Sequence, residues 1–595
     1  MKKRMLLLSV AVLLVFCAGL FAQNVEKGDT LVVSPTDESG NPLLGALNMA
    51  IHGDTTEAGE QAHSVYELIP NAQYILTEVL QINSPMTIYA PEPADDKRPP
   101  VVRCGTKEDG SAVDNLWHIY DDVAFKNIWF SGVNLDGNGP IAWILQTVQV
   151  SGIEISYDGC IMEFPYTWWA SFADWGGMNV YKINDCIFQY IGNPTGTTWN
   201  GAIFNGDGSD SIIVRNSTFF DFGCFAVKGA YYTEIDHCTF VNSIVHPIDS
   251  HKHVKRVFTN NLFMNCHAFS DDNDEISRHF DQEVKGIMNY AEIQWDPQEL
   301  DSLWGPGGVY GKTYDPDGDG VLEETEQVWT LKNNAWYYTD PIKDYWDAFD
   351  EVVPNPWMNN YNKAMFENKD GDWSWTVMSY ERDTNEVIVD SAEVTVEHGV
   401  YEYFTEENTM NVDPGIVDMN ETDELLAQNC TNIRLSQAGE EVEDVKWHNV
   451  DNYLAFEWPL TYDLSYTNST LQTAGRNGNP VGSLQWWDIE YEPTAIDNNV
   501  NIAEEFALAQ NYPNPFNPTT TINYQLGQPA NVKLTVYDIM GREVKTLVNT
   551  SKNIGSYNAV WDATNNHGNA VSTGVYFYRL QAGDKTFVKK MMLMK

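Results

Sequence analysis

The stretch Ile183-Asn184-Asp185-Cys186-Ile187-Phe188 decides the fold, because close copies of it return three times before residue 264. The copies are Val214-Arg215-Asn216-Ser217-Thr218-Phe219, Glu234-Ile235-Asp236-His237-Cys238-Thr239-Phe240 and Phe258-Thr259-Asn260-Asn261-Leu262-Phe263. Their closing phenylalanines are 31, 21 and 23 residues apart. A strand that recurs at this period, with a polar corner before its last aromatic residue, predicts a solenoid. Each unit of a solenoid buries its apolar face only by stacking on a neighbour.

Residues 45–105 predict the first turns of this solenoid. Residues 45–51 are apolar and compatible with a helix, and short strands separated by turn residues follow at 65–72, 74–76, 80–82 and 86–89. This run is similar to the opening of the pectate-lyase-like superfamily, where an amphipathic cap covers the end of the coil. The resemblance implies an all-β fold, a right-handed parallel β-helix, whose open end needs such a cap.

Further units and two interruptions are visible along the chain. Rungs are predicted at 125–130 and 153–155, and the repeated phrase resumes at 329–336. We therefore expect a β-helix domain over 23–490 with insertions at 264–330 and 337–375, where functional loops tend to sit. Residues 422–487 are interpreted as strands of a C-terminal flap, and 491–505 as a linker.

The last 90 residues, 506–595, carry the most specific motif. Asn511-Tyr512-Pro513-Asn514-Pro515-Phe516-Asn517-Pro518 precedes alternating strands at regular spacing, which predicts a small Ig-like β-sandwich. The block resembles the C-terminal sorting domain of type IX secretion substrates. The resemblance implies the type IX secretion machinery as a partner, and a protein that is released or attached to the cell surface after export.

The N-terminus predicts a signal peptide over residues 1–22. Lys2, Lys3 and Arg4 precede an apolar run that ends before Ala22. We expect a mature chain that is extracellular or on the outer cell surface, with no stable membrane span. The formal charge of 35 − 84 = −49 argues against a nucleic-acid partner and favours divalent cations.

The cysteines are predicted to be buried filler. Seven remain after residue 22, an odd number that fits a disulfide framework poorly. Cys160, Cys186 and Cys238 share one phase of the repeat, so we expect them to stack inside the coil as small hydrophobic residues.

A calcium loop is predicted in the first insertion. Asp315-Pro316-Asp317-Gly318-Asp319-Gly320-Val321-Leu322, followed by Glu326, satisfies the D-x-D-x-D-G-x5-E pattern. Asp315, Asp317, Asp319 and Glu326 would supply carboxylates, and Val321 its carbonyl, to Ca²⁺. No helices flank the loop, so its expected role is to order the insertion; the alternative is a solvated acidic turn.

A catalytic site is predicted near residues 228–256. The rung pair 234–267 looks like the pectate lyase pattern, which implies calcium held by aspartates and an arginine base. Only Asp249 matches an aspartate of that pattern, Val245 replaces its partner, and the arginine motif is missing. Residues 246–256 are instead the most basic patch of an acidic domain, where His251, Lys252 or Arg256 could act as base beside Lys228. The alternative is an exposed turn whose cations pair with nearby acids.

Tryptophans in the loops between early rungs suit sugar rings. Trp168, Trp169, Trp175 and Trp199 are candidates for stacking on pyranose faces, the alternative being that they pack the loops onto the coil. Two functions follow for a polysaccharide or glycan ligand. One is a polysaccharide lyase or glycoside hydrolase with calcium support, and the other is a non-catalytic glycan-binding surface protein.

Overall fold

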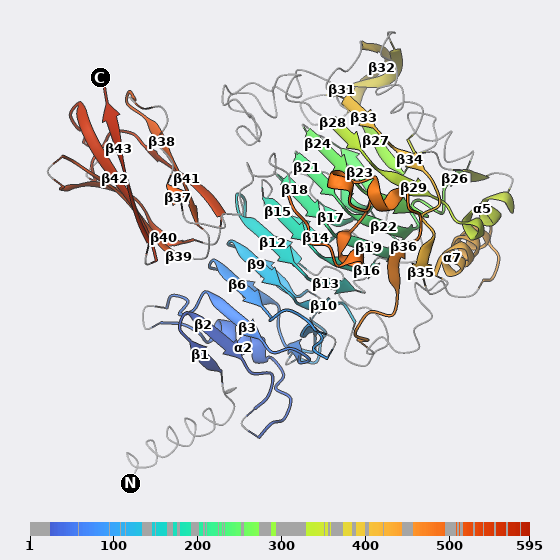
Figure 1. Ribbon diagram of the computed structural model, residues 1–595, viewed down its shortest axis with the longest axis horizontal. Coiled ribbons are helices and arrows are strands. Elements are labelled where there is room, and N and C mark those ends of the chain that lie inside the picture. Colours follow the sequence, from blue (N-terminus) through green and yellow to red (C-terminus); the bar gives the residue numbers. More distant parts are fainter. Residues whose placement is uncertain are drawn as a thin grey trace.

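The computed structural model describes residues 24–493 and 507–594 with gaps, the longest being 134–145, 164–169, 175–178, 192–201, 273–286, 293–328, 359–372, 383–387, 399–403 and 443–455. Three sheets of parallel strands follow one another around a coil, which is a parallel β-helix as predicted (Figure 1). Among the described residues, each rung from β3 to β27 contributes one strand to each sheet. A short antiparallel strand, β1 (Val25–Lys27), precedes the coil, and helix α2 (Ala46–His52) lies where the cap was predicted.

The first sheet contains β2 (Thr30–Val33), β3 (Val65–Leu68), β6 (Met86–Tyr89), β9 (Val123–Lys126), β12 (Glu154–Asp158), β15 (Val180–Asn184), β18 (Ser211–Arg215), β21 (Tyr232–Asp236), β24 (Lys255–Thr259), β28 (Trp329–Lys332) and β33 (Phe404–Glu407). The second contains β4 (Gln73–Leu76), β7 (Val101–Cys104), β10 (Trp129–Ser131), β13 (Ile161–Glu163), β16 (Ile187–Ile191), β19 (Thr218–Phe222), β22 (Thr239–Ser243), β25 (Leu262–Met264), β29 (Ala335–Tyr337) and β34 (Met410–Asn411). The third contains β5 (Leu80–Ile82), β8 (Trp117–Ile119), β11 (Gln146–Val148), β14 (Ala170–Asp174), β17 (Ala202–Asn205), β20 (Phe225–Lys228), β23 (Ile248–His251) and β27 (Met288–Glu292).

The phenylalanines that close the repeated phrase form one stack inside the coil. Phe188 stacks on Phe219 at 4.6 Å between ring centroids, Phe219 on Phe240 at 4.7 Å, and Phe240 on Phe263 at 4.8 Å. The rings are within 6° of parallel, and all are buried. The spacing matches the distance between neighbouring strands, so each ring covers the one below it.

The polar corner of the phrase is a left-handed turn between the first and second sheets. One residue in each successive rung has φ between 46° and 62°: Asn127, Gly159, Asp185, Asn216, His237, Asn260, Asn333 and Asn408. Asparagine, aspartate, histidine and glycine are the residues that tolerate this conformation best. Their side chains also bond along the coil: Asn408 donates to Asn333 and Asn333 to Asn260, both at 3.0 Å.

The predicted cysteine stack is confirmed directly after this corner. Cys160, Cys186 and Cys238 are fully buried and free, and among the described residues the other cysteines are free and buried too. Burial raises the pKa of the Cys186 and Cys238 thiols well above the usual value. These cysteines therefore fill space and are not reactive thiols.

The two predicted insertions contain some regular secondary structure. Within 264–330, β26 (Asp271–Asp272) leaves the coil, but β27 returns to it as a strand of the third sheet. After β29 come helix α5 (Asp340–Asp347), β30 (Val352–Val353), which pairs with β26, and the hairpin of β31 (Trp373–Arg382) and β32 (Ile388–His398). The predicted signal peptide lies outside the described residues.

The interpretation of 422–487 as strands is wrong over most of its length. The segment begins with helix α7 (Thr422–Gln437), and its described residues contain one strand, β36 (Asp463–Tyr466), paired with β35 (Ile416–Asp418). Short 3₁₀ turns follow: η2 (Leu471–Thr473), η3 (Arg476–Gly478) and η4 (Leu484–Trp487). Helix α7 forms because Leu426, Cys430 and Ile433 recur at helical spacing and are buried against the coil.

Residues 456–492, which we name the strap, cover the outer face of the second sheet. That face is apolar along one column, Val101, Trp129, Ile161 and Ile187, and is packed by Phe456, Trp458, Leu460 and Trp486. Beside it, Tyr462 stacks on Phe220 at 4.3 Å and donates a 2.6 Å hydrogen bond to Gln189. The strap therefore removes from water an apolar sheet face that would otherwise be exposed.

A buried acid, Glu163, lies in the second column of this face. It is 3% exposed and accepts a 2.9 Å hydrogen bond from Gln189. Burial raises the pKa of its carboxyl from 4.5 to about 7, although contacts with Gln189, Trp129 and Ser131 and the charge of Arg98 oppose the rise. A raised pKa means that the protonated carboxyl is the form that the folded protein prefers.

The sorting-domain segment is an antiparallel sandwich, as predicted. One sheet has β37 (Ala507–Leu508), β38 (Thr520–Leu526) and β41 (Gly555–Trp561); the other has β40 (Glu543–Lys552), β39 (Ala530–Tyr537), β42 (Gly574–Ala582) and β43 (Lys585–Leu593). The proline-rich motif contacts both sheets. Phe516 is buried against Trp561. The Asn511 side-chain amide donates to the Thr520 hydroxyl, and the Asn511 backbone N–H donates to the Tyr578 hydroxyl at 2.8 Å.

Phe240→Ala tests the ring stack. Removing a fully buried ring between two others is expected to lower the free energy of unfolding of the coil by about 4 kcal/mol. Urea unfolding followed by tryptophan fluorescence measures it. Val417→Ala, at a side chain 57% exposed, is the control and should change the midpoint little. Equal effects of the two substitutions would contradict the stack as a source of stability.

Glu163→Gln tests the buried acid. Because the folded pKa is raised, its stabilising contribution is complete below pH 4.5 and is lost as pH rises through about 7. Between these values the wild type should lose roughly 3 kcal/mol relative to the variant, at about 1.4 kcal/mol per pKa unit. Glu92→Gln, at a side chain 76% exposed, should leave the pH profile unchanged. Parallel profiles for wild type and Glu163→Gln would refute the raised pKa.

Candidate functional site

Two of the predicted catalytic residues, Lys228 and Asp249, occupy one register position in the third sheet. Lys228 of β20 pairs with Asp249 of β23, and Asp249 pairs in turn with Asn289 of β27. The residues just before the first two, Val227 and Ile248, are buried in the core of the coil. Buried neighbours of this kind hold the register, since a slip by one residue would expose them.

His251 lies two residues further along β23, past an irregularity in the pairing, and is opposite Glu292 of β27. Asn289 and Glu292 were not predicted, because β27 lies within the segment 264–330 interpreted as an insertion. A signal for them exists in the sequence. Met288-Asn289 repeats the apolar–polar step of Val227-Lys228 and Ile248-Asp249.

Arg256 does not belong with these residues, and this corrects the predicted basic patch. It lies in β24 of the first sheet, two positions before the core residue Phe258, and is 2% exposed. Residues two apart on a strand share a face, so Arg256 is on the inner face of the coil. Its guanidinium hydrogen-bonds to the hydroxyl of Thr233 in the neighbouring rung. The patch is thus divided between the third sheet and the interior.

Other predicted site residues lie outside the described residues. These are Lys252, the calcium-loop residues Asp315, Asp317, Asp319, Val321 and Glu326, and the tryptophans Trp168, Trp169, Trp175 and Trp199. Within the part of the chain that the structure describes, no group of three or more His, Cys, Asp or Glu residues is arranged to hold a metal ion.

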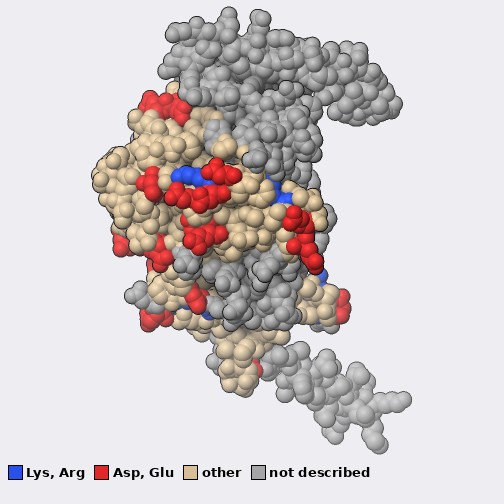
Figure 2. Space-filling model, turned by 90° about the vertical axis from the view of Figure 1, so that its right-hand side faces the viewer, with Lys and Arg blue, Asp and Glu red and all other residues tan. Residues whose placement is uncertain are grey.

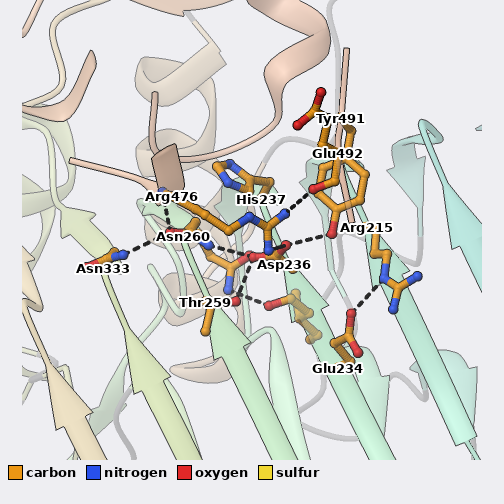
Figure 3. A network of polar contacts seen from close by, with 12 residues as sticks. Arg215, Glu234, Asp236, His237, Thr259, Asn260, Asn333, Arg476, Tyr491 and Glu492 are labelled. Carbon is orange, nitrogen blue, oxygen red and sulfur yellow. Dashed lines mark hydrogen bonds and ion pairs between the residues drawn. The ribbon is translucent and has the colours of Figure 1, made fainter. Parts of the chain in front are cut away.

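The polar network around Asp236 joins the strap to the coil (Figure 3). One carboxylate oxygen of Asp236 accepts hydrogen bonds from Thr259 at 2.6 Å and Asn260 at 2.7 Å. The other accepts from the Tyr491 hydroxyl at 2.6 Å and lies 2.9 Å from Arg476 Nη1. Coil residues thus hold one oxygen, and strap residues hold the other.

The strap also bonds to the left-handed corners of the coil. The Arg476 amide donates to Asn260 Oδ1 at 2.9 Å, and the Gly482 amide donates to the Asn260 carbonyl at 2.7 Å. His237 Nδ1 lies 3.2 Å from the Gly482 carbonyl. The Ser483 hydroxyl donates to the Asn216 carbonyl at 3.1 Å. The strap therefore forms hydrogen bonds with three successive corners.

Asp236 and His237 both have lowered pKa values, so both favour the deprotonated form. Burial opposes ionisation of Asp236, but the neighbouring His237 and Arg476 and the hydrogen bonds from Thr259 and Tyr491 hold its pKa below 3.8. Burial lowers the pKa of His237 below 6.5, although Asp236 opposes this. At neutral pH the pair is an aspartate ion beside a neutral imidazole.

This network is a clasp that fixes the strap, which we name the Asp236 clasp. Asp236 and His237 are both almost fully buried, and the contacts of the Asp236 carboxylate are satisfied by protein groups. A carboxylate closed off in this way holds elements together and leaves no position for substrate. Asp236 and His237 therefore form a structural corner of the coil.

Comparison with known proteins identifies the C-terminal block. Residues 510–594 match the family described as the secretion system C-terminal sorting domain. Among solved structures, the chain is similar to PorZ of Porphyromonas gingivalis, an essential surface component of the type IX secretion system, at 21% identity over 16% of this chain and 12% of PorZ, with a TM-score of 0.12. It is also similar to dimeric latent PorU of the same organism, at 23% identity over 15% of this chain and 9% of PorU, with a TM-score of 0.14. No curated protein matches.

The chain is therefore a parallel β-helix protein that carries a type IX secretion sorting domain. Such a domain directs export to the cell surface or beyond it, which confirms the expected destination and the association with the secretion machinery. None of the helices in the described part of the chain has both the length and the apolar character that crossing a membrane requires.

Asp236→Asn tests the clasp. Loss of the charge leaves Arg476 and Tyr491 without their ionic partner, which should destabilise the strap by about 3 kcal/mol. Amide hydrogen exchange of residues 471–492 measures this at pH 7. Because the folded pKa of Asp236 is lowered, the difference from wild type should persist above pH 3.8 and shrink as pH falls below it.

The exposed Asp463→Asn provides the matched control and should leave exchange of the strap unchanged. Unaltered exchange in Asp236→Asn would mean that the apolar contacts and the other hydrogen bonds of the strap hold it without a contribution from the clasp.

Proposed function

We propose that the protein is a carbohydrate-active β-helix protein, secreted or displayed on the cell surface, that degrades a polysaccharide as a lyase or hydrolase with calcium support. The observation that supports this best is the register of the third sheet. It aligns Lys228, Asp249 and Asn289 on neighbouring rungs and sets His251 opposite Glu292. Two acids, a cation and an imidazole thereby belong to three adjacent strands.

The chemistry of these groups fits two related reactions. In a lyase, Lys228 or His251 would remove the proton α to a uronate carboxylate, and a cation would offset the carboxylate charge. In a hydrolase, Asp249 and Glu292 would be the two carboxyl groups that act as acid and as base or nucleophile. Both reactions draw on β23 and β27.

The position of the predicted calcium loop in the chain supports a role for calcium. The loop with Asp315, Asp317, Asp319, Val321 and Glu326 lies between β27 and β28, so an ion bound there would order the segment that leaves the candidate site. Acidic side chains cover more of the described surface in Figure 2 than basic ones do. That balance favours a neutral polysaccharide, or a uronate polymer whose charge calcium offsets.

The second candidate is a glycan-binding surface protein without catalysis. It is favoured by Trp168, Trp169, Trp175 and Trp199 in the loops between early rungs, which offer stacking faces and require no reacting groups. Catalysis releases cleavage products and binding alone does not, so one screen distinguishes the enzyme from the binding protein.

Substitutions in the third sheet test the enzyme. The exported protein is incubated with neutral and uronic-acid polysaccharides, with calcium or with a chelator, and the products are separated by chromatography. Lys228→Ala, Asp249→Asn and Glu292→Gln should each lower turnover at least 100-fold, as expected for loss of a general acid or base. Chelation should lower it as well. Lys332→Ala removes a cation of the first sheet, paired with Glu407 at 2.8 Å, and should retain full turnover.

Unsaturated products would establish a lyase, and reducing ends without unsaturation a hydrolase. Retention of a polysaccharide without cleavage would support the binding protein. Cleavage that survives all three substitutions would move the site away from the third sheet.

A further inference from the structure

Arg103 is a buried arginine that has no counter-ion among the described residues. It is 4% exposed, its Nε is out of contact with solvent, and this atom has no hydrogen-bond partner among the described residues. Nor does any described acid form an ion pair with its guanidinium. Burial lowers the pKa of Arg103, but a guanidinium does not give up its proton at physiological pH. Among the described residues, no acid therefore compensates this charge.

The position of Arg103 is defined by the second sheet. It lies in β7, one position after the inward-facing Val102, and so on the outer face of the sheet, between Ile75 of β4 and Ser131 of β10. Ser131 is fully buried and accepts a 3.4 Å hydrogen bond from the Val133 amide. The guanidinium thus shares its column with a hydroxyl and an aliphatic side chain.

Glu163, the nearest acid of that column, is engaged elsewhere. It is two rungs from Arg103, beyond Ser131, and its carboxyl is held by Gln189, which in turn bonds to Tyr462 of the strap. The arginine whose charge acts on Glu163 is Arg98, not Arg103. Arg98 has partners of its own, the Asn71 carbonyl at 3.2 Å and the ring of Phe456 at 5.3 Å.

An uncompensated charge of this kind costs several kcal/mol of folding free energy. A sequence with 84 acidic residues against 35 basic ones has no shortage of acids to place beside it. Arginine also presents a planar fork of donors that matches carboxylate and sulfate groups.

We infer that Arg103 is an oxyanion-binding residue, which receives the carboxylate or sulfate group of a ligand at the outer face of β7. The site lies in the second sheet and does not depend on the proposed function of the third. A free small anion and an acidic sugar carry the same chemistry, so the experiment must separate them.

Thermal unfolding of the exported protein provides the test. Sodium acetate, sodium sulfate and a uronic-acid disaccharide are titrated in turn, with chloride keeping ionic strength constant. At least one should raise Tm in a saturable way for the wild type. Arg103→Gln should weaken the apparent Kd at least tenfold, and Arg103→Lys, which keeps the charge but loses the fork, should fall between. Arg98→Gln, a neighbouring arginine that has partners, should leave Kd within twofold of wild type.

A response to acetate or sulfate assigns the site to small anions, and a response to the disaccharide alone assigns it to an acidic glycan. The inference is overturned if no anion gives a saturable response, or if Arg103→Gln responds as the wild type does. Should Arg103→Gln fail to fold, Arg103→Lys and Arg98→Gln still decide: equal Kd values in both would overturn it.

Discussion

One left-handed residue in each rung from Asn127 to Asn408 is the constraint on which this structure depends. The chain turns from the first sheet to the second through a single residue with positive φ, and Asn, Asp, His or Gly occupies that position from Asn127 to Asn408. Because the turn has a fixed length, the next residues enter the second sheet in the same phase each time. That phase directs Phe188, Phe219, Phe240 and Phe263 inward, where they stack. The corner thus determines the core.

The same corners receive the strap. Their carbonyl and side-chain groups face outward along one edge of the coil, and Asn216, His237 and Asn260 bond to residues 476–483. The Asp236 clasp completes this attachment, and the apolar outer face of the second sheet is covered as a result. Residues that resemble a catalytic cluster in sequence, Asp236 and His237, are therefore committed to holding the protein together. In the third sheet, Lys228, Asp249 and Asn289 share one register position on neighbouring rungs.

Much of the fold is predictable because it rests on local, repeated chemistry. The polar corner and the aromatic residue that closes each phrase lie within six residues of each other, so the coil, the ring stack and the buried cysteines follow from the sequence. The sandwich follows from prolines and alternating strands in the same way. Lys228 and Asp249 could be placed on neighbouring rungs for this reason, since the period brings them into register.

The rest depends on contacts between distant residues or on exceptions to the period. Tyr491 meets Asp236 across 255 residues, and no repeat connects the strap with the coil. Helix α7 has short apolar clusters that also suit strands, and its helical spacing is decided by the surface it packs against. Strand β27 belongs to the third sheet, but no copy of the repeated phrase precedes it. Asn289 and Glu292 could therefore not be predicted from the repeat. Arg256 was misplaced because an arginine inside the coil contradicts the usual rule for charged residues.

A crystal structure of the exported protein with a bound oligosaccharide tests the central claim most directly. That claim is that the third sheet, around β20, β23 and β27, is where a glycan meets this coil. The account predicts a sugar ring within hydrogen-bonding distance of Lys228, Asp249 or Glu292, with the Asp236 clasp intact. An oligosaccharide bound along the first sheet, or one that displaces the strap to reach Asp236 and His237, would contradict it.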